Sequence, residues 1–153
     1  LYAHMNVNYL RLSQLPDFDH YGQLLDVMAK GDGFISTGEI LLPRATIRAG
    51  RANSIHVETD VDYTFPLWLA EIVWGNGKET HRHVIDLQST HEFGHKGFVW
   101  DADAPGWTWA RFAVWDVAGD GAFTNPVWRE PPKAASGTTP HPARTISSSR
   151  RAF

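Results

Sequence analysis

The spacing of apolar residues changes near Phe34. Between Pro16 and Gly31 the apolar residues follow the 3.6-residue period of a helix, and from Phe34 onward they alternate with polar residues at period two. Gly, Pro, Asn and Asp interrupt the alternating part about every eight to twelve residues, as is typical of short strands joined by turns. The pattern therefore predicts one helix followed by an all-β region.

The helical pattern lies between Pro16 and Gly31. Its apolar residues are Tyr21, Leu24, Leu25, Val27 and Met28. Asp17 and Asp19 carry side chains that can cap a helix amino terminus, and Gly31 is a residue type that often ends helices. We therefore expect one short helix that is capped by an aspartate and ends at Gly31.

The alternating pattern occurs in nine short segments. They are residues 34–37, 40–42, 45–49, 54–59, 64–74, 80–87, 94–100, 108–117 and 122–128. This number of short strands favours an antiparallel β-sandwich of the immunoglobulin-like or jelly-roll kind. We predict three parts: an amino-terminal arm at 1–15 that contains a short strand or an extended segment, a helix plus β-sandwich domain at 16–130, and a disordered tail at 131–153, which has no periodic apolar residues.

The stretch from Trp107 to Trp128 predicts a β-hairpin, because two aromatic and β-branched runs meet across a Gly-Asp-Gly turn. Alternation places Trp109, Arg111 and Trp115 on the face opposite Phe112. A strand with aromatic carbon on both faces indicates that each face is covered by protein or that one face binds something. We interpret Trp109, Arg111 and Trp115 as a candidate surface for a protein partner or for self-association.

Composition limits the classes of function. The 153 residues suit one domain. The net charge of -3 argues against nucleic-acid binding, and no apolar run reaches the roughly 20 residues that span a bilayer. The chain has no cysteine, which excludes disulfides and thiolate zinc sites. The compartment is not determined, and export to the bacterial periplasm or secretion is compatible with this composition.

Residues 91–95 match the zincin pattern His-Glu-x-x-His. In that pattern His91 and His95 bind zinc from one face of a helix, and Glu92 acts as the base. The flanking residues are β-branched and interrupted by glycine, which favours a loop or strand in place of the required helix. We therefore expect that residues 91–95 are not helical, and we keep a small metal-dependent hydrolase using Glu92 as an alternative function.

A second candidate metal site is formed by His81 and His83. Alternation places both imidazoles on one face of a strand, where they could hold zinc or copper. Gly75 precedes His81 as in the first cupin motif, but Gln88 stands near the position at which that motif has Glu, and a second cupin motif is absent. The same residues suit a solvated sheet face, so a cupin-like metal enzyme is a further alternative and no cofactor is required.

Two regions together resemble a known family. Leu24 to Glu39 has the order of short helix, glycine, strand and Thr-Gly, and the runs Phe65 to Gly75 and Trp109 to Trp128 follow it. This arrangement resembles the carboxyl-terminal β-sandwich module of PHP-superfamily metal-dependent hydrolases of the carbaryl-hydrolase-like branch. The resemblance covers about residues 6–129 and rests on pattern.

The resemblance implies that the catalytic barrel of such a hydrolase would lie upstream of this chain. The barrel supplies the metal ligands of the family, and none of them is carried over to this sequence. We therefore expect an accessory β-sandwich domain that serves binding, packing or assembly. Whether the chain is itself an enzyme stays undecided from the sequence.

Overall fold

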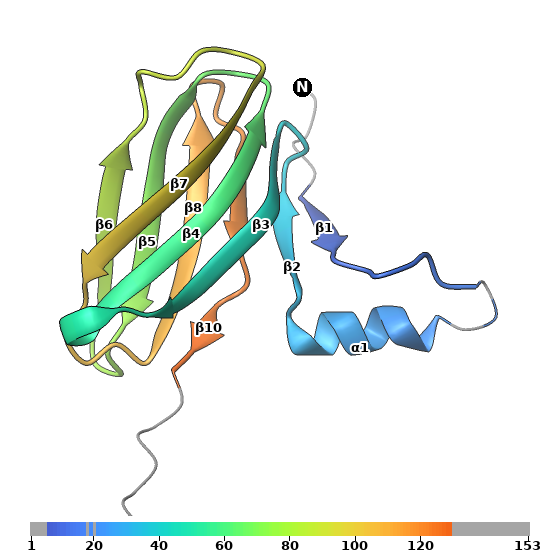
Figure 1. The fold of residues 1–153 in the computed structure, drawn as a ribbon, viewed down its shortest axis with the longest axis horizontal. Coiled ribbons are helices and arrows are strands. Elements are labelled where there is room, and N and C mark those ends of the chain that lie inside the picture. The colour runs from blue at the N-terminus through green and yellow to red at the C-terminus, as the bar shows by residue number, and fades with distance from the viewer. Residues whose placement is uncertain (1–5, 18, 20, 130–153) are drawn as a thin grey trace, which may run out of the picture.

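The computed structural model describes residues 6–17, 19 and 21–129, and these form two antiparallel sheets with one α-helix. Figure 1 shows the sheets as two layers, with β3, β4 and β7 in front of β5, β6 and β8. This architecture confirms the prediction of an all-β sandwich with one short helix. Among the described residues, no helix has the length and apolar character needed to cross a membrane.

Sheet A, the larger sheet, has the strand order β1-β2-β9-β8-β5-β6, and β10 also pairs with β8. Its strands are β1 (Val7–Leu10), β2 (Gly33–Ser36), β5 (Leu67–Gly75), β6 (Thr80–Asp86), β8 (Trp109–Asp116), β9 (Gly121–Thr124) and β10 (Val127–Trp128). Sheet B consists of β3 (Ile40–Ala49), β4 (Ser54–Tyr63) and β7 (Gly94–Asp103), in the order β3-β4-β7. A short 3-10 turn, Arg51–Asn53, joins β3 to β4.

The core lies between the two sheets and follows the period-two pattern. In β4 every second residue from Ile55 to Tyr63 is buried, and the residues between them are partly exposed. Sheet A contributes Leu67, Ile72 and Phe112, which are fully buried. One face of each sheet therefore packs inward, and the other faces outward.

Proline explains several differences from the predicted strands. Residues 40–42 and 45–49 belong to one strand, β3, whose pairing with β4 shifts between Leu41 and Arg44, on either side of Pro43. Because proline has no N–H to donate, it interrupts the regular ladder at this point. The predicted strands 64–74 and 122–128 are also interrupted, and β5 begins only after Pro66 while β9 and β10 are separated by Asn125 and Pro126.

The predicted amino-terminal arm includes β1, which pairs with β2 at one edge of sheet A. Arg11 then holds the arm against sheet B, because its guanidinium donates to the carbonyl oxygen of Leu42 at 2.8 Å. Of the two predicted possibilities for this segment, a short strand or an extended segment, the structure has the short strand. Residues 1–5 of the arm and the predicted disordered tail, 131–153, lie outside the described residues.

The helix α1 (Gly22–Lys30) ends as predicted and begins later than predicted. Gly31 adopts a left-handed φ of 70°, and its N–H reaches the carbonyl oxygen of Met28 at 3.0 Å. The predicted aspartate cap is wrong, because Tyr21 occupies the N-cap position and makes no side-chain capping hydrogen bond. None of the helix residues is buried, and Figure 1 shows α1 beside the end of β2, clear of both sheets.

The predicted hairpin is formed by β8 and β9, and Asp116 organises its turn. The Oδ1 atom of Asp116 accepts hydrogen bonds from the backbone N–H groups of Ala118 at 2.8 Å and Asp120 at 2.9 Å. Gly119 supplies the positive φ of 91° that the turn requires. Burial raises the pKa of Asp116, and the two backbone hydrogen bonds oppose that effect. This turn fixes the register that brings Trp115 opposite Gly121.

Candidate functional site

The outer face of sheet A carries the residues that the sequence indicated as a binding surface. Trp115 pairs with Leu69 and Arg111 pairs with Val73, whereas Phe112, on the opposite face, is fully buried in the core. Trp109, Arg111 and Trp115 are each partly exposed. The predicted alternation is therefore correct, and these three side chains face away from the sandwich interior.

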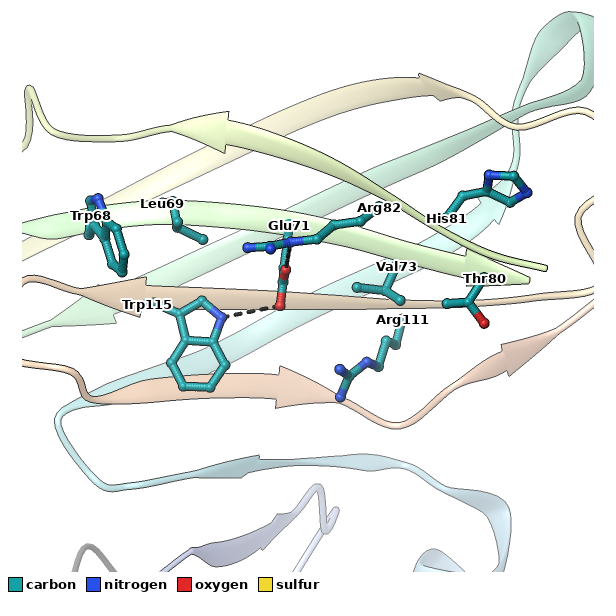
Figure 2. A pocket seen from close by; sticks show the side chains of 9 residues that line it. All are labelled: Trp68, Leu69, Glu71, Val73, Thr80, His81, Arg82, Arg111 and Trp115. Carbon is teal, nitrogen blue, oxygen red and sulfur yellow. Dashed lines mark hydrogen bonds and ion pairs between the residues drawn. The ribbon is translucent and has the colours of Figure 1, made fainter.

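A groove of about 440 Å³ crosses this face (Figure 2). Its walls come from three neighbouring strands, β5, β6 and β8. The lining residues are Trp68, Leu69, Glu71, Val73, Thr80, His81, Arg82, Arg111 and Trp115. Aromatic, aliphatic and charged side chains thus meet in one concave site, as is typical of ligand-binding grooves.

Glu71 is the buried charged residue of the groove, with 7% of its surface exposed. Its Oε1 atom accepts a hydrogen bond from the indole Nε1 of Trp115 at 3.3 Å, and its Oε2 atom forms an ion pair with Nε of Arg82. Figure 2 shows the carboxylate between these two side chains. The cost of burying the carboxylate is offset by these contacts, which also fix the orientation of the Trp115 ring.

Arg111 differs from Arg82 because none of the described carboxylates forms an ion pair with it. Among the described residues its one recorded partner is the ring of Phe123, whose centroid lies 5.5 Å from the guanidinium carbon. Arg111 is partly buried and lines the groove. Its guanidinium N–H donors are therefore available to a group that enters from solvent.

Three further aromatic side chains, Trp68, Phe123 and Trp128, lie on the same outer face. Phe123 of β9 pairs with Ala113 of β8. Trp68 is 51% exposed at one end, and Trp128, on β10, is 68% exposed at the other. Trp128 lies beside Trp109, with ring centroids 6.4 Å apart. We call the set Trp68, Trp109, Trp115, Phe123 and Trp128 the aromatic face.

The structure does not bring the zincin motif into catalytic geometry. Residues 91–93 form a loop, and Gly94 and His95 begin β7, which confirms that residues 91–95 are not an α-helix. His95 contacts Asp62 of β4 through its Nδ1 atom. His91 and Glu92 are exposed in the loop, so His91, Glu92 and His95 do not share one helical face.

His81 and His83 do share one face of β6, as predicted, because they pair with Trp74 and Ile72 on the same side of β5. The imidazole of His81 stacks on Trp74 with ring centroids 4.1 Å apart, and its Nε2 atom lies 3.3 Å from the Asn76 amide nitrogen. His83 is exposed. Across residues 6–17, 19 and 21–129, no three His, Cys, Asp or Glu side chains are grouped as a metal site.

Comparisons of this chain with known protein families, with characterised proteins and with solved structures find no match. The resemblance to PHP-type hydrolases therefore stays a prediction from the sequence.

The sequence indicated Trp109, Arg111 and Trp115 but missed Glu71, Arg82 and Trp68. Glu71 stands out in the sequence as a charged residue within an apolar run, which is the signal that could have identified it. Its partner Arg82 could not be identified in advance, because that required the register between β5 and β6.

Proposed function

We propose that this chain is a non-catalytic accessory β-sandwich domain of a PHP-type metal-dependent hydrolase, and that it associates with protein through the outer face of sheet A. The observation that carries this proposal is the aromatic face, on which Trp68 and Trp128 are more than half exposed. The resemblance of the sequence to the carboxyl-terminal module of those hydrolases supports the accessory role.

The energetics of apolar surface favour association through this face. Each Å² of apolar surface removed from water contributes about 25 cal/mol, so exposed tryptophans gain free energy when a partner covers them. Tryptophan and arginine are also enriched among the residues that dominate binding at protein interfaces. The aromatic face and Arg111 supply both residue types on one surface.

The proposal is tested by measuring the molar mass of the chain by light scattering at increasing concentration. We expect the wild type to self-associate and the double variant Trp68→Ser with Trp128→Ser to remain monomeric. The matched control is Phe93→Ser with Val99→Ser, because these residues of β7 and its preceding loop are 81% and 61% exposed but lie away from the aromatic face. The control should associate as the wild type does.

A wild type that stays monomeric up to about millimolar concentration would contradict association through exposed tryptophan. Equal loss of association in the control variant would show that exposed apolar residues act without regard to their location. Circular dichroism of each variant establishes that the β-sandwich is retained.

The two alternative functions, a metal-dependent hydrolase and a cupin-like enzyme, both require a bound metal ion. We expect protein purified without a histidine tag to hold far less than one equivalent of zinc or copper, because His91 and His95 do not lie on one helix and the imidazole of His81 stacks on Trp74. Elemental analysis measures the content. Stoichiometric zinc that is lost in His91→Ala, or copper lost in His83→Ala, would support an enzyme in place of an accessory domain.

A further inference from the structure

We propose that the groove on the outer face of sheet A binds a small carboxylate that contains a ring, with the carboxylate at Arg111 and the ring against Trp68 and Trp115. This inference rests on the proposed function, since both use the same face of sheet A. It adds a ligand class to that face.

Charge in the groove is the first argument. The lining residues include two guanidinium groups, Arg82 and Arg111, and one carboxylate, Glu71. The Glu71 carboxylate is engaged by Arg82, so the groove retains the positive charge of Arg111. The planar guanidinium presents paired N–H donors that match the two oxygens of a carboxylate, which makes an anionic group the complementary ligand.

The position of Arg111 is also restrained. Its guanidinium lies over the ring of Phe123 on the neighbouring strand β9, at 5.5 Å from the ring centroid. A cation held over an aromatic ring keeps its edge N–H donors free for a ligand. Arg111 is thus oriented by contacts that do not use its hydrogen-bonding capacity.

Apolar walls are the second argument, and they favour a ring. Trp68 is exposed at one end of the groove, and the partly exposed Trp115 lies beside Glu71. Leu69 and Val73 line the groove from β5, the strand between β6 and β8. Flat aromatic side chains offer their largest contact area to another flat or ring-shaped body. The volume of about 440 Å³ lies within the range of about 300–1,000 Å³ that small-molecule sites occupy.

Glu71 gives the ligand a direction. A carboxylate near Glu71 would meet a like charge, whereas a carboxylate at Arg111 meets an opposite one. Figure 2 shows Arg111 and Trp115 as separate projections from β8, with Glu71 nearer to Trp115. The charged end of the ligand therefore lies at Arg111 and its ring toward Trp115, while the hydroxyl of Thr80 is available to a polar substituent.

The test is a calorimetric titration of the full chain with four probes. Benzoate and glucuronate are ring-containing carboxylates, aromatic and saccharide respectively, and benzamide and glucose are their neutral counterparts. We expect at least one carboxylate to bind about tenfold or more tightly than its neutral counterpart. The carboxylate that binds identifies the kind of ring.

Three variants locate the binding. Arg111→Gln should weaken the bound carboxylate about tenfold or more, and Arg111→Lys, which keeps the charge and loses the planar fork, should weaken it less. Trp68→Ser changes a half-exposed side chain and should weaken binding while the fold is retained. The control Arg48→Gln removes an exposed arginine on β3 of sheet B and should leave binding unchanged.

The inference is overturned if neither carboxylate binds at about 10 mM, if the neutral probes bind equally well, or if Arg111→Gln binds as the wild type does. Its failure is distinguishable from failure of the proposed function. If no carboxylate binds but the chain self-associates through Trp68 and Trp128, only the proposed ligand is contradicted. If a carboxylate binds but the chain stays monomeric, only the proposed protein association is contradicted.

Discussion

The outer faces of the two sheets differ in whether their side chains have partners within the molecule. On sheet B, the ionisable outward residues of β4 are His56, Glu58, Asp60 and Asp62, and each is paired with a residue of β3 or β7. On sheet A, the outward side chains include the aromatic face and Arg111, whose surfaces remain open to solvent.

The pairs on sheet B form three groups, one of which is the contact of His95 with Asp62. Arg44 contacts Glu58 at 2.6 Å and Asp60 at 2.9 Å, and its presence lowers the pKa of Asp60, chiefly through their hydrogen bond. His56 contacts Asp101 at 2.9 Å. These groups satisfy one another at a solvated surface, so nothing in this charge pattern requires a ligand.

The contrast teaches that charge count alone does not identify a binding face. The ionisable residues on the outward side of β4 in sheet B are matched within the molecule. On sheet A, Arg111 has no ion-pair partner among the described residues and lies beside partly exposed aromatic carbon. A binding face is better recognised by unmatched groups than by polar groups as such.

The largest expected difference between the two faces is the loss in the free energy of unfolding when a glutamate of each face is replaced by alanine. Glu71→Ala should lower it by about 1–3 kcal/mol, because the partly buried Trp115 indole N–H loses its hydrogen bond to a charged acceptor. Glu58→Ala, the matched change on sheet B, should have a clearly smaller effect because Arg44 retains Asp60. Urea unfolding at neutral pH measures both values, and equal losses would remove the distinction between the faces.

The smallest expected effect concerns pH. Since Arg44 lowers the pKa of Asp60 below its ordinary value of 3.8, the pair stabilises the fold above that value, and the contribution is lost as pH falls through the lowered pKa. Arg44→Gln should therefore be slightly less stable than the wild type at neutral pH, and this deficit should become smaller at about pH 2.

Urea unfolding at both pH values checks this expectation. The control is Arg48→Gln, in which an exposed arginine of the same strand is removed without loss of a described ion pair. A deficit of Arg44→Gln that persists unchanged at low pH would show that packing of the Arg44 side chain, and not its charge, stabilises sheet B.

The sequence predicted the class of fold because alternation at period two survives tertiary packing. The hairpin of β8 and β9 was recognisable because its turn residues act locally, through Asp116 and Gly119. The prediction of an aspartate cap for α1 was wrong because a residue type that can cap a helix does not determine where the helix begins. Local signals thus predicted elements more reliably than boundaries.

The groove could be predicted only in part. Alternation alone placed Arg111 and Trp115 on one face, but Glu71 and Arg82 meet through the pairing of β5 with β6. The zincin pattern shows the opposite case, because His91 and His95 have the spacing of the pattern in sequence but lie on a loop and a strand in place of a helix. Spacing predicts a site only where the secondary structure that it assumes is present.

The pairing of β2 with β9 has a consequence for how the chain folds. The backbone N–H of Thr37 donates to Gly121 across 84 positions of sequence, whereas the β5–β6 and β8–β9 hairpins close over short turns. During synthesis the amino-terminal edge of sheet A therefore waits, with unpaired strand groups, until β9 has left the ribosome. Pairings of such long sequence separation form slowly, so this edge stays open to aggregation for longer than the strands of the two hairpins do.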